Sequence, residues 1–132
     1  MAEVLGAVSA SLHLAEKLVQ YCRSFKSASE DAANLAEEIA AVSQVLGTLQ
    51  RSVQNPPPGL SFQQTSSLLS SLQNCMRRMQ VLEDSLAPHV SDLGNLLRRA
   101  KWPLRHKETV ETVQALHRFV QIFHFASTAD GL

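Results

Sequence analysis

The stretch Val4-Leu-Gly-Ala-Val-Ser-Ala-Ser-Leu-His-Leu-Ala15 carries no charged side chain and begins three residues after Met1. The apolar residues from here to Phe25 recur at helical spacing, which predicts one continuous helix. The expected inward face is Val4, Val8, Leu12, Ala15, Val19 and Cys22, widened by Leu5, Leu18 and Phe25. The run is shorter than the ~20 residues of a membrane span, and Glu3 replaces the basic start of a signal peptide. The helix is therefore either a core helix or a segment that can leave the core for another apolar environment.

The composition indicates one all-α domain. The chain has 132 residues, 45% of them hydrophobic and 5% aromatic. No stretch alternates with the period of a strand, so we expect an antiparallel bundle of four to five helices over 1–126. Residues 127–132 are expected to form a flexible tail.

Capping signals and prolines divide the rest of the chain into helices. Ser27 with Glu30 and Ser61 with Gln64 form capping boxes that open a second and a third helix. The second helix has the inward stripe Leu35, Ile39, Val42, Leu46, Leu49 and Val53. The third has Leu68, Leu72, Cys75, Met79, Leu82 and Leu86.

The C-terminal third is expected to contain a short helix and a long one. Pro88 should close the third helix, and a short fourth helix should follow and stop near Trp102. Pro103 is then expected in the first turn of the last helix, which runs to about Ala126. Its predicted inward residues are Val110, Val113, Leu116, Val120 and Phe123.

The chain shows no catalytic or metal-binding motif. His106, His117 and His124 share a helix face, but rises of roughly 16 Å and 10 Å between them are too long for one ion. We expect these histidines to flank the core. Cys22 and Cys75 lie on apolar stripes and are expected to be buried thiols of a protein in a reducing cytosol. We therefore expect no enzyme activity, no metal and no cofactor.

Two clusters of like charge stand out in a chain of net charge zero, which argues against a nucleic-acid partner. The basic cluster is Arg98, Arg99, Lys101, Trp102, Arg105 and Lys107. It would suit an anionic lipid surface, or it could be a solvated turn with Trp102 packed inward. The acidic block is Glu30, Asp31, Glu37 and Glu38. It is either favourable charge at a helix start or a docking face for a basic partner, such as the basic cluster of another copy.

Two stretches resemble fungal HeLo-like (HELL) domains. Met1 to Leu12, with Leu18-Val-Gln-Tyr-Cys22 after it, resembles the start of these domains. Lys101-Trp-Pro-Leu-Arg-His-Lys-Glu108, followed by a helix ending in Phe119 to Ala126, resembles their Trp-Pro segment and last helix. Such domains form the N-termini of fungal NOD-like (STAND) receptors and of amyloid-signalled cell-death effectors. The family is similar to the HET-S HeLo domain and to the four-helix bundle of MLKL.

The resemblance implies a membrane-permeabilising domain of fungal programmed cell death, as in heterokaryon incompatibility and innate immunity. Such a domain is cytoplasmic when inactive. C-terminal amyloid or nucleotide-binding regions of the full-length protein would drive its self-association into oligomers, and it would then act on anionic lipids at the plasma membrane. The implied insertion helix carries Val4, Leu5, Gly6, Val8, Leu12, Leu14 and Leu18. The alternative is a non-lytic homotypic or adaptor interaction domain of a fungal NOD-like receptor.

Overall fold

The computed structural model describes residues 2–25, 30–54, 62–90 and 102–127. These residues form four helices and no strand, which confirms the all-α prediction. The helices are α1 (Ala2–Ser24), α2 (Glu30–Gln54), α3 (Phe62–Val90) and α4 (His106–Ser127). The expected caps at Ser27 and Ser61, the short helix after 91 and the tail from 128 lie outside the described residues.

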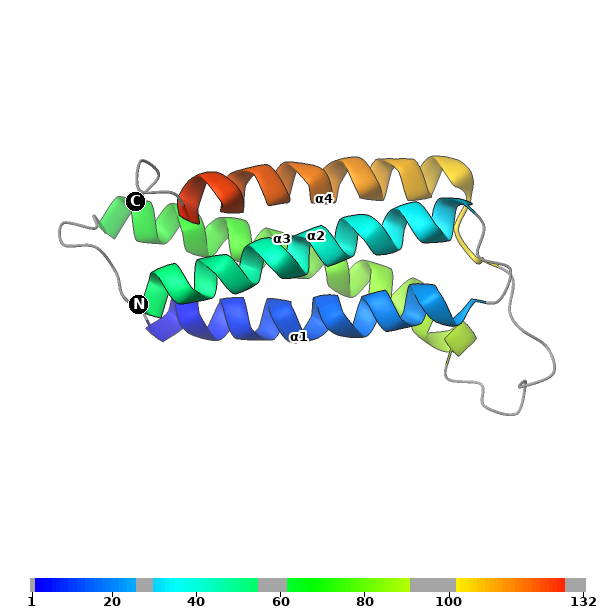
Figure 1. Cartoon of the computed structure of the whole chain (residues 1–132), viewed down its shortest axis with the longest axis horizontal. Coiled ribbons are helices and arrows are strands. Elements are labelled where there is room, and N and C mark those ends of the chain that lie inside the picture. Colours follow the sequence, from blue (N-terminus) through cyan, green and yellow to red (C-terminus); the bar gives the residue numbers. More distant parts are fainter. Residues whose placement is uncertain (1, 26–29, 55–61, 91–101, 128–132) are drawn as a thin grey trace.

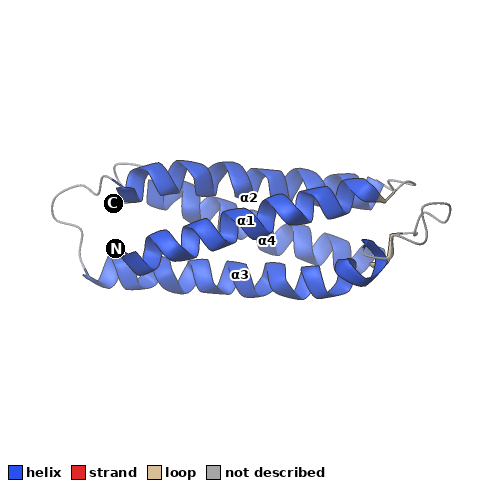
Figure 2. Cartoon of the chain, turned by 90° about the horizontal axis from the view of Figure 1, so that it is seen from below, coloured by secondary structure: helices blue, strands red, loops and turns tan. Residues whose placement is uncertain are grey.

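The four helices lie along one long axis, and consecutive helices run in opposite directions (Figure 1). α1 packs extensively against α2 and α3, and α2 packs extensively against α4, whereas α3 and α4 make a much thinner contact. Figure 2 shows the same elongated bundle from below. One side of the bundle is therefore less tightly closed than the others.

The core follows the stripes of α2 and α3 as the sequence predicts. All six stripe residues of each helix are buried, including Leu35, Ile39, Leu72 and Met79 with no exposed surface. The 4–3 spacing of these residues keeps one apolar face turned toward the neighbouring helices over the full length of each helix. The resulting core is continuous from one end of the bundle to the other.

Three local expectations are wrong. α3 continues past Pro88 to Val90, so this proline lies inside the helix as the structure defines it. α4 begins at His106 and not at Pro103, and the backbone N–H of Thr109 donates to the Arg105 carbonyl (3.0 Å) in its first turn. Of the predicted inward residues of this helix, Val110 is 37% exposed and Thr109 is buried in its place, whereas Leu116 and Phe123 are buried as predicted.

Candidate functional site on α1 and the two flanks of α4

The residues expected to insert into a membrane lie in or against the core of this structure. Val4, Val8 and Leu18 have no exposed surface. Leu5, Leu12 and Leu14 are half-buried and pack against the core. Gly6 is exposed, and a Cβ at this position would meet no atom within 4 Å. Burying the apolar face of α1 in this way hides it from water.

The buried seam of α1 contains one residue that the prediction left out, Ser11. Ser11 and the predicted Leu18 are fully buried, while Leu12 and Val19 are only half-buried beside them. Among the residues that the structure describes, none forms a hydrogen bond with the Oγ of Ser11. An unpaired buried hydroxyl costs about 1–3 kcal/mol, so α1 carries a destabilising group at the centre of its uncharged run. The sequence analysis did not identify Ser11 because it assigned inward positions to apolar residues and so chose the adjacent Leu12.

Two polar contacts tie α1 to its neighbours, and both lie at the surface. Lys17 Nζ is 2.8 Å from Glu83 Oε2 on α3. Its hydrogen bond to this carboxylate and the attraction between the two charges raise the pKa of Lys17. Gln50 Nε2 of α2 donates to Ser9 Oγ (3.2 Å). Exposed contacts of this kind contribute little to stability, so α1 is held mainly by apolar packing.

The described part of the basic cluster begins at Trp102, while Arg98, Arg99 and Lys101 lie outside it. Trp102 packs edge-to-face on Phe25, with ring centroids 5.2 Å apart. Its Nε1–H donates to Thr109 Oγ1 (3.1 Å), and this hydroxyl donates to the Arg105 carbonyl (3.1 Å). These contacts agree with the interpretation in which Trp102 packs inward.

The two cations of the cluster within the described residues, Arg105 and Lys107, are exposed. Arg105 directly precedes α4, and Lys107 lies in its first turn. Both follow closely after Trp102, whose ring packs on Phe25. Trp102 is therefore packed against the bundle, while both cations lie at its surface.

The acidic block supplies carboxylates to two histidines of α4. Nδ1 of His106 is 2.8 Å from Asp31 Oδ1, and Nδ1 of His117 is 2.8 Å from Glu38 Oε1. α2 and α4 run in the same direction (Figure 1), so the two pairs follow one another in the same order along both helices. Sequence analysis predicted that the histidines flank the core, but not that they pair with the acidic block, because spacing within one helix does not reveal its neighbour.

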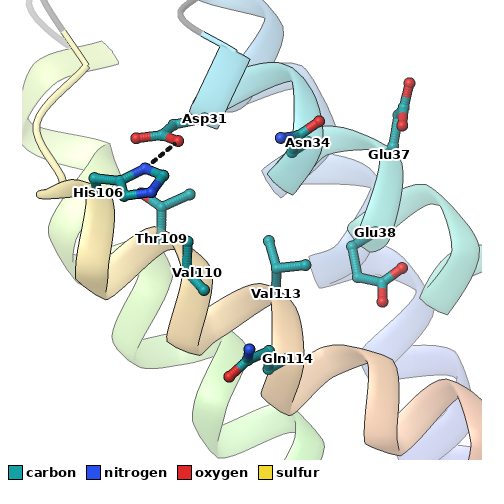
Figure 3. A pocket seen from close by; sticks show the side chains of 9 residues that line it. All are labelled: Asp31, Asn34, Glu37, Glu38, His106, Thr109, Val110, Val113 and Gln114. Atoms are coloured by element: carbon teal, nitrogen blue, oxygen red, sulfur yellow. Dashed lines mark hydrogen bonds and ion pairs between the residues drawn. The ribbon is translucent and has the colours of Figure 1, made fainter.

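A cavity of about 570 Å³ opens between these pairs on the α2–α4 flank. Figure 3 shows the Asp31–His106 pair at one end, Glu38 toward the other, and Val110 and Val113 projecting from α4 between them. Asn34 also lines the cavity. Amide, carboxylate and aliphatic groups thus face one another here.

A second groove, of about 560 Å³, lies on the other flank of α4, against α3. It is lined by Asn74, Arg77, Arg78, Val81, Ala115, Arg118, Phe119 and Ile122. Val81 is 60% and Ile122 43% exposed, so the groove presents apolar surface to water between arginines. No sequence motif predicted it, since it results from the thin contact between two helices.

Cys22 and Cys75 are buried in the core, as the sequence predicted. Burial raises the pKa of each thiol from 9.0 to about 12, so both are protonated at neutral pH. Within the described ranges, no three His, Cys, Asp or Glu side chains are grouped so that they could hold a metal ion. The described side chains therefore present surfaces for packing and charge contact.

No described helix combines the length and the apolar character needed to cross a membrane. Comparison of the chain with models of protein families, with curated proteins and with solved structures found no match. The function of the chain is therefore inferred from its own residues.

Proposed function

We propose that this chain is a HeLo-like, membrane-permeabilising execution domain of regulated cell death, activated by oligomerisation and acting through α1. One observation carries the proposal. α1 has an uncharged apolar run that is held in the bundle mainly by packing and contains an unpaired buried hydroxyl at Ser11. Such a helix can exchange one apolar environment for another, because lipid chains are about as apolar as the core it leaves.

The length of the run sets the form that insertion takes. Residues Val4 to Ala15 extend over roughly 18 Å of helix, against a hydrocarbon thickness of about 30 Å. Glu16 and Lys17 follow directly. A single α1 would therefore lie in the interface with its apolar face down. Several copies acting together would be needed to disrupt the bilayer, which is why the proposal requires oligomerisation.

Exposed cations would bring the bundle to an anionic surface. Arg105 and Lys107 are exposed at the start of α4, and Arg98, Arg99 and Lys101 precede them in the chain. Each such cation contributes about 1 kcal/mol near an anionic leaflet. Electrostatic attraction would thus precede release of α1.

Dye leakage from vesicles tests the proposal. The chain is fused to an inducible oligomeriser and added to phosphatidylcholine vesicles with and without phosphatidylserine. We expect leakage on oligomerisation, and more of it with the anionic lipid. Absence of leakage from both kinds of vesicle would contradict the proposal.

A charge-insertion variant tests the role of the apolar face of α1. Leu12 and Leu14 are half-buried at the two edges of this face, so L12E/L14E places two charges where α1 would meet lipid and leaves the fully buried seam intact. The charge-matched control is Q20E/S24E, at two exposed positions of α1 beyond the run. We expect leakage to be lost in the first variant and retained in the second. Equal leakage from both would exclude α1 as the inserting element.

The second candidate is a non-lytic homotypic or adaptor interaction domain of a NOD-like receptor. The open grooves on both flanks of α4 favour it, since partner surfaces could dock in them. This function predicts association in solution without any leakage from vesicles. The leakage assay therefore separates the two candidates.

A further inference from the structure

The α3–α4 groove is an apolar surface framed by arginines. Val81 and Ile122 are largely exposed in it, beside the half-buried Phe119. The wall on α3 carries Arg77 and Arg78, and the wall on α4 carries Arg118. An exposed apolar groove with charged edges is typical of a surface that receives an amphipathic helix.

The three arginines are available to a partner. Arg77 donates to Asn74 Oδ1 (3.4 Å), and the Nε–H of Arg118 donates to the Gln114 carbonyl (3.4 Å). Within the described part of the chain, neither these two arginines nor Arg78 forms an ion pair. None of the described residues that line the groove is acidic. The groove therefore has a positive charge that the bundle leaves uncompensated at this site.

The same chain carries a complementary ridge on the outer face of α2. Glu30, Ala33 and Glu37 are exposed, and Ala41 is half-exposed one turn further on. The two glutamates are about 10 Å apart along the helix. Glu37 also lines the rim of the α2–α4 cavity, and Figure 3 shows its side chain directed away from His106 and Val113 of α4. Unlike Asp31 and Glu38, neither ridge glutamate has an ion-pair partner among the described residues.

We infer that the α2 ridge of one copy of this chain docks into the α3–α4 groove of a second copy. The alanines let the helix backbone approach the apolar floor, while the glutamates reach the arginines on the groove walls. Opposite charges at exposed positions set orientation and partner choice. The ridge carries two negative charges and the groove three positive ones, and both surfaces belong to the same chain, which favours a second copy as the occupant.

The contact joins two different surfaces, so each copy offers a free ridge and a free groove after pairing. Such a heterologous contact continues into a ring or a filament. The inference deepens the proposed function by naming the surface through which copies oligomerise. That this contact leads to membrane permeabilisation rests on the proposed function. The association of copies is measured separately, in solution.

Charge reversal with rescue in trans tests the contact. The variants are E30K/E37K, which has two positive surfaces, and R77E/R78E, which has two negative ones. Controls matched in charge change are E3K/E16K and R23E/R51E, at exposed positions of α1 and α2. Self-association is measured by sedimentation at low and moderate salt, and folding is checked by circular dichroism.

We expect the wild type and both controls to self-associate, more strongly at low salt. Each reversal variant alone should associate at least tenfold more weakly. An equimolar mixture of the two should recover association, because the ridge of R77E/R78E meets the groove of E30K/E37K. Wild-type association by both reversal variants, or no recovery on mixing, would overturn the inference.

Two further arms identify a different occupant. If the wild type stays monomeric while R77E/R78E loses binding to phosphatidylserine vesicles, the groove is a lipid site and the inference is wrong. If the wild type stays monomeric but binds a synthetic acidic amphipathic helix, the partner is another protein, and the inference is again wrong. Leakage is measured on the same proteins. Charge-dependent association without leakage supports the contact and contradicts the permeabilising function, so the two failures are distinguishable.

Discussion

α1 and α4 have nearly the same length, 23 and 22 residues, but hold the bundle together in different ways. α1 buries Val4, Val8, Ser11, Ala15, Leu18 and Cys22. α4 buries Thr109, Leu116 and Phe123, and leaves Ile122 and Phe125 43% and 64% exposed. α4 packs extensively against α2, where two histidine–carboxylate pairs add to the apolar contact, but it contacts α3 only thinly. α1 therefore buries most of its apolar surface within the bundle, whereas α4 leaves part of its apolar surface exposed to water.

Truncation of a large aliphatic side chain should give the largest difference in stability between variants of the two helices. Leu18 of α1 has no exposed surface, so L18A should lower the free energy of unfolding by about 2–5 kcal/mol. I122A on the exposed flank of α4 should change it by about 0.5 kcal/mol or less. Urea unfolding followed by circular dichroism measures both. Equal losses would show that α4 is packed as tightly as α1.

Removal of the unpaired hydroxyl should strengthen α1. S11A takes out the buried Oγ without adding volume, and should raise the free energy of unfolding by about 1–3 kcal/mol. S70A, at an exposed position of α3, is the control and should not stabilise the protein. If release of α1 drives leakage, S11A should also slow leakage from vesicles. A destabilised S11A protein would indicate that the hydroxyl is satisfied by water.

The buried thiols should make the protein sensitive to alkali. The folded-state pKa of Cys22 and Cys75 is about 12 against 9.0 when exposed, so the unfolded state loses its thiol protons first. Stability should therefore be complete below pH 9 and fall by about 1.4 kcal/mol per pH unit for each thiol as the pH rises toward 12. Unfolding of C22A/C75A across this range is the comparison, and its profile should be flatter. If the wild type and C22A/C75A lost stability equally as the pH rises, the two thiols would not be the cause of the loss.

Filling the exposed helical glycine should stabilise α1 by a smaller amount. G6A meets no neighbouring atom and removes the entropic cost of a glycine inside a helix, about 1 kcal/mol. G47A, on α2 and also without a neighbour within 4 Å, is the matched control for the same substitution outside α1. Both should raise the midpoint of thermal unfolding, but G6A alone should slow leakage.

Breaking a histidine–carboxylate pair should have the smallest effect. His117 is 58% exposed in its side chain, so H117A should lower the free energy of unfolding by less than about 1 kcal/mol. H124A, on the same helix and exposed, is the control. A loss comparable with that of L18A would show that the pairs, and not apolar packing, hold α4 in place.

Much of the fold could be predicted from the sequence, but the site could not. The stripes of α2 and α3 were predicted residue by residue, since each carries a regular 4–3 repeat of large apolar residues. α1 and α4 were predicted as helices, but with the wrong residues inward at Ser11 and Thr109. The inward faces of α1 and α4 mix small and polar residues with large apolar ones. Periodicity alone therefore does not determine which of two adjacent residues points into the core.

The sequence by itself determined that this chain is helical and that its first helix has a long uncharged run, because spacing and charge are local properties. Only the tertiary structure decided which partners those helices have. It joined Asp31 to His106 and Glu38 to His117, laid Trp102 on Phe25 and left the α3–α4 groove open. These contacts join residues far apart in the chain, and they depend on which helices become neighbours, which no single helix encodes. The uncharged run of α1 is thus determined by the sequence, while the cavity and the groove on the two flanks of α4 are determined by the tertiary structure.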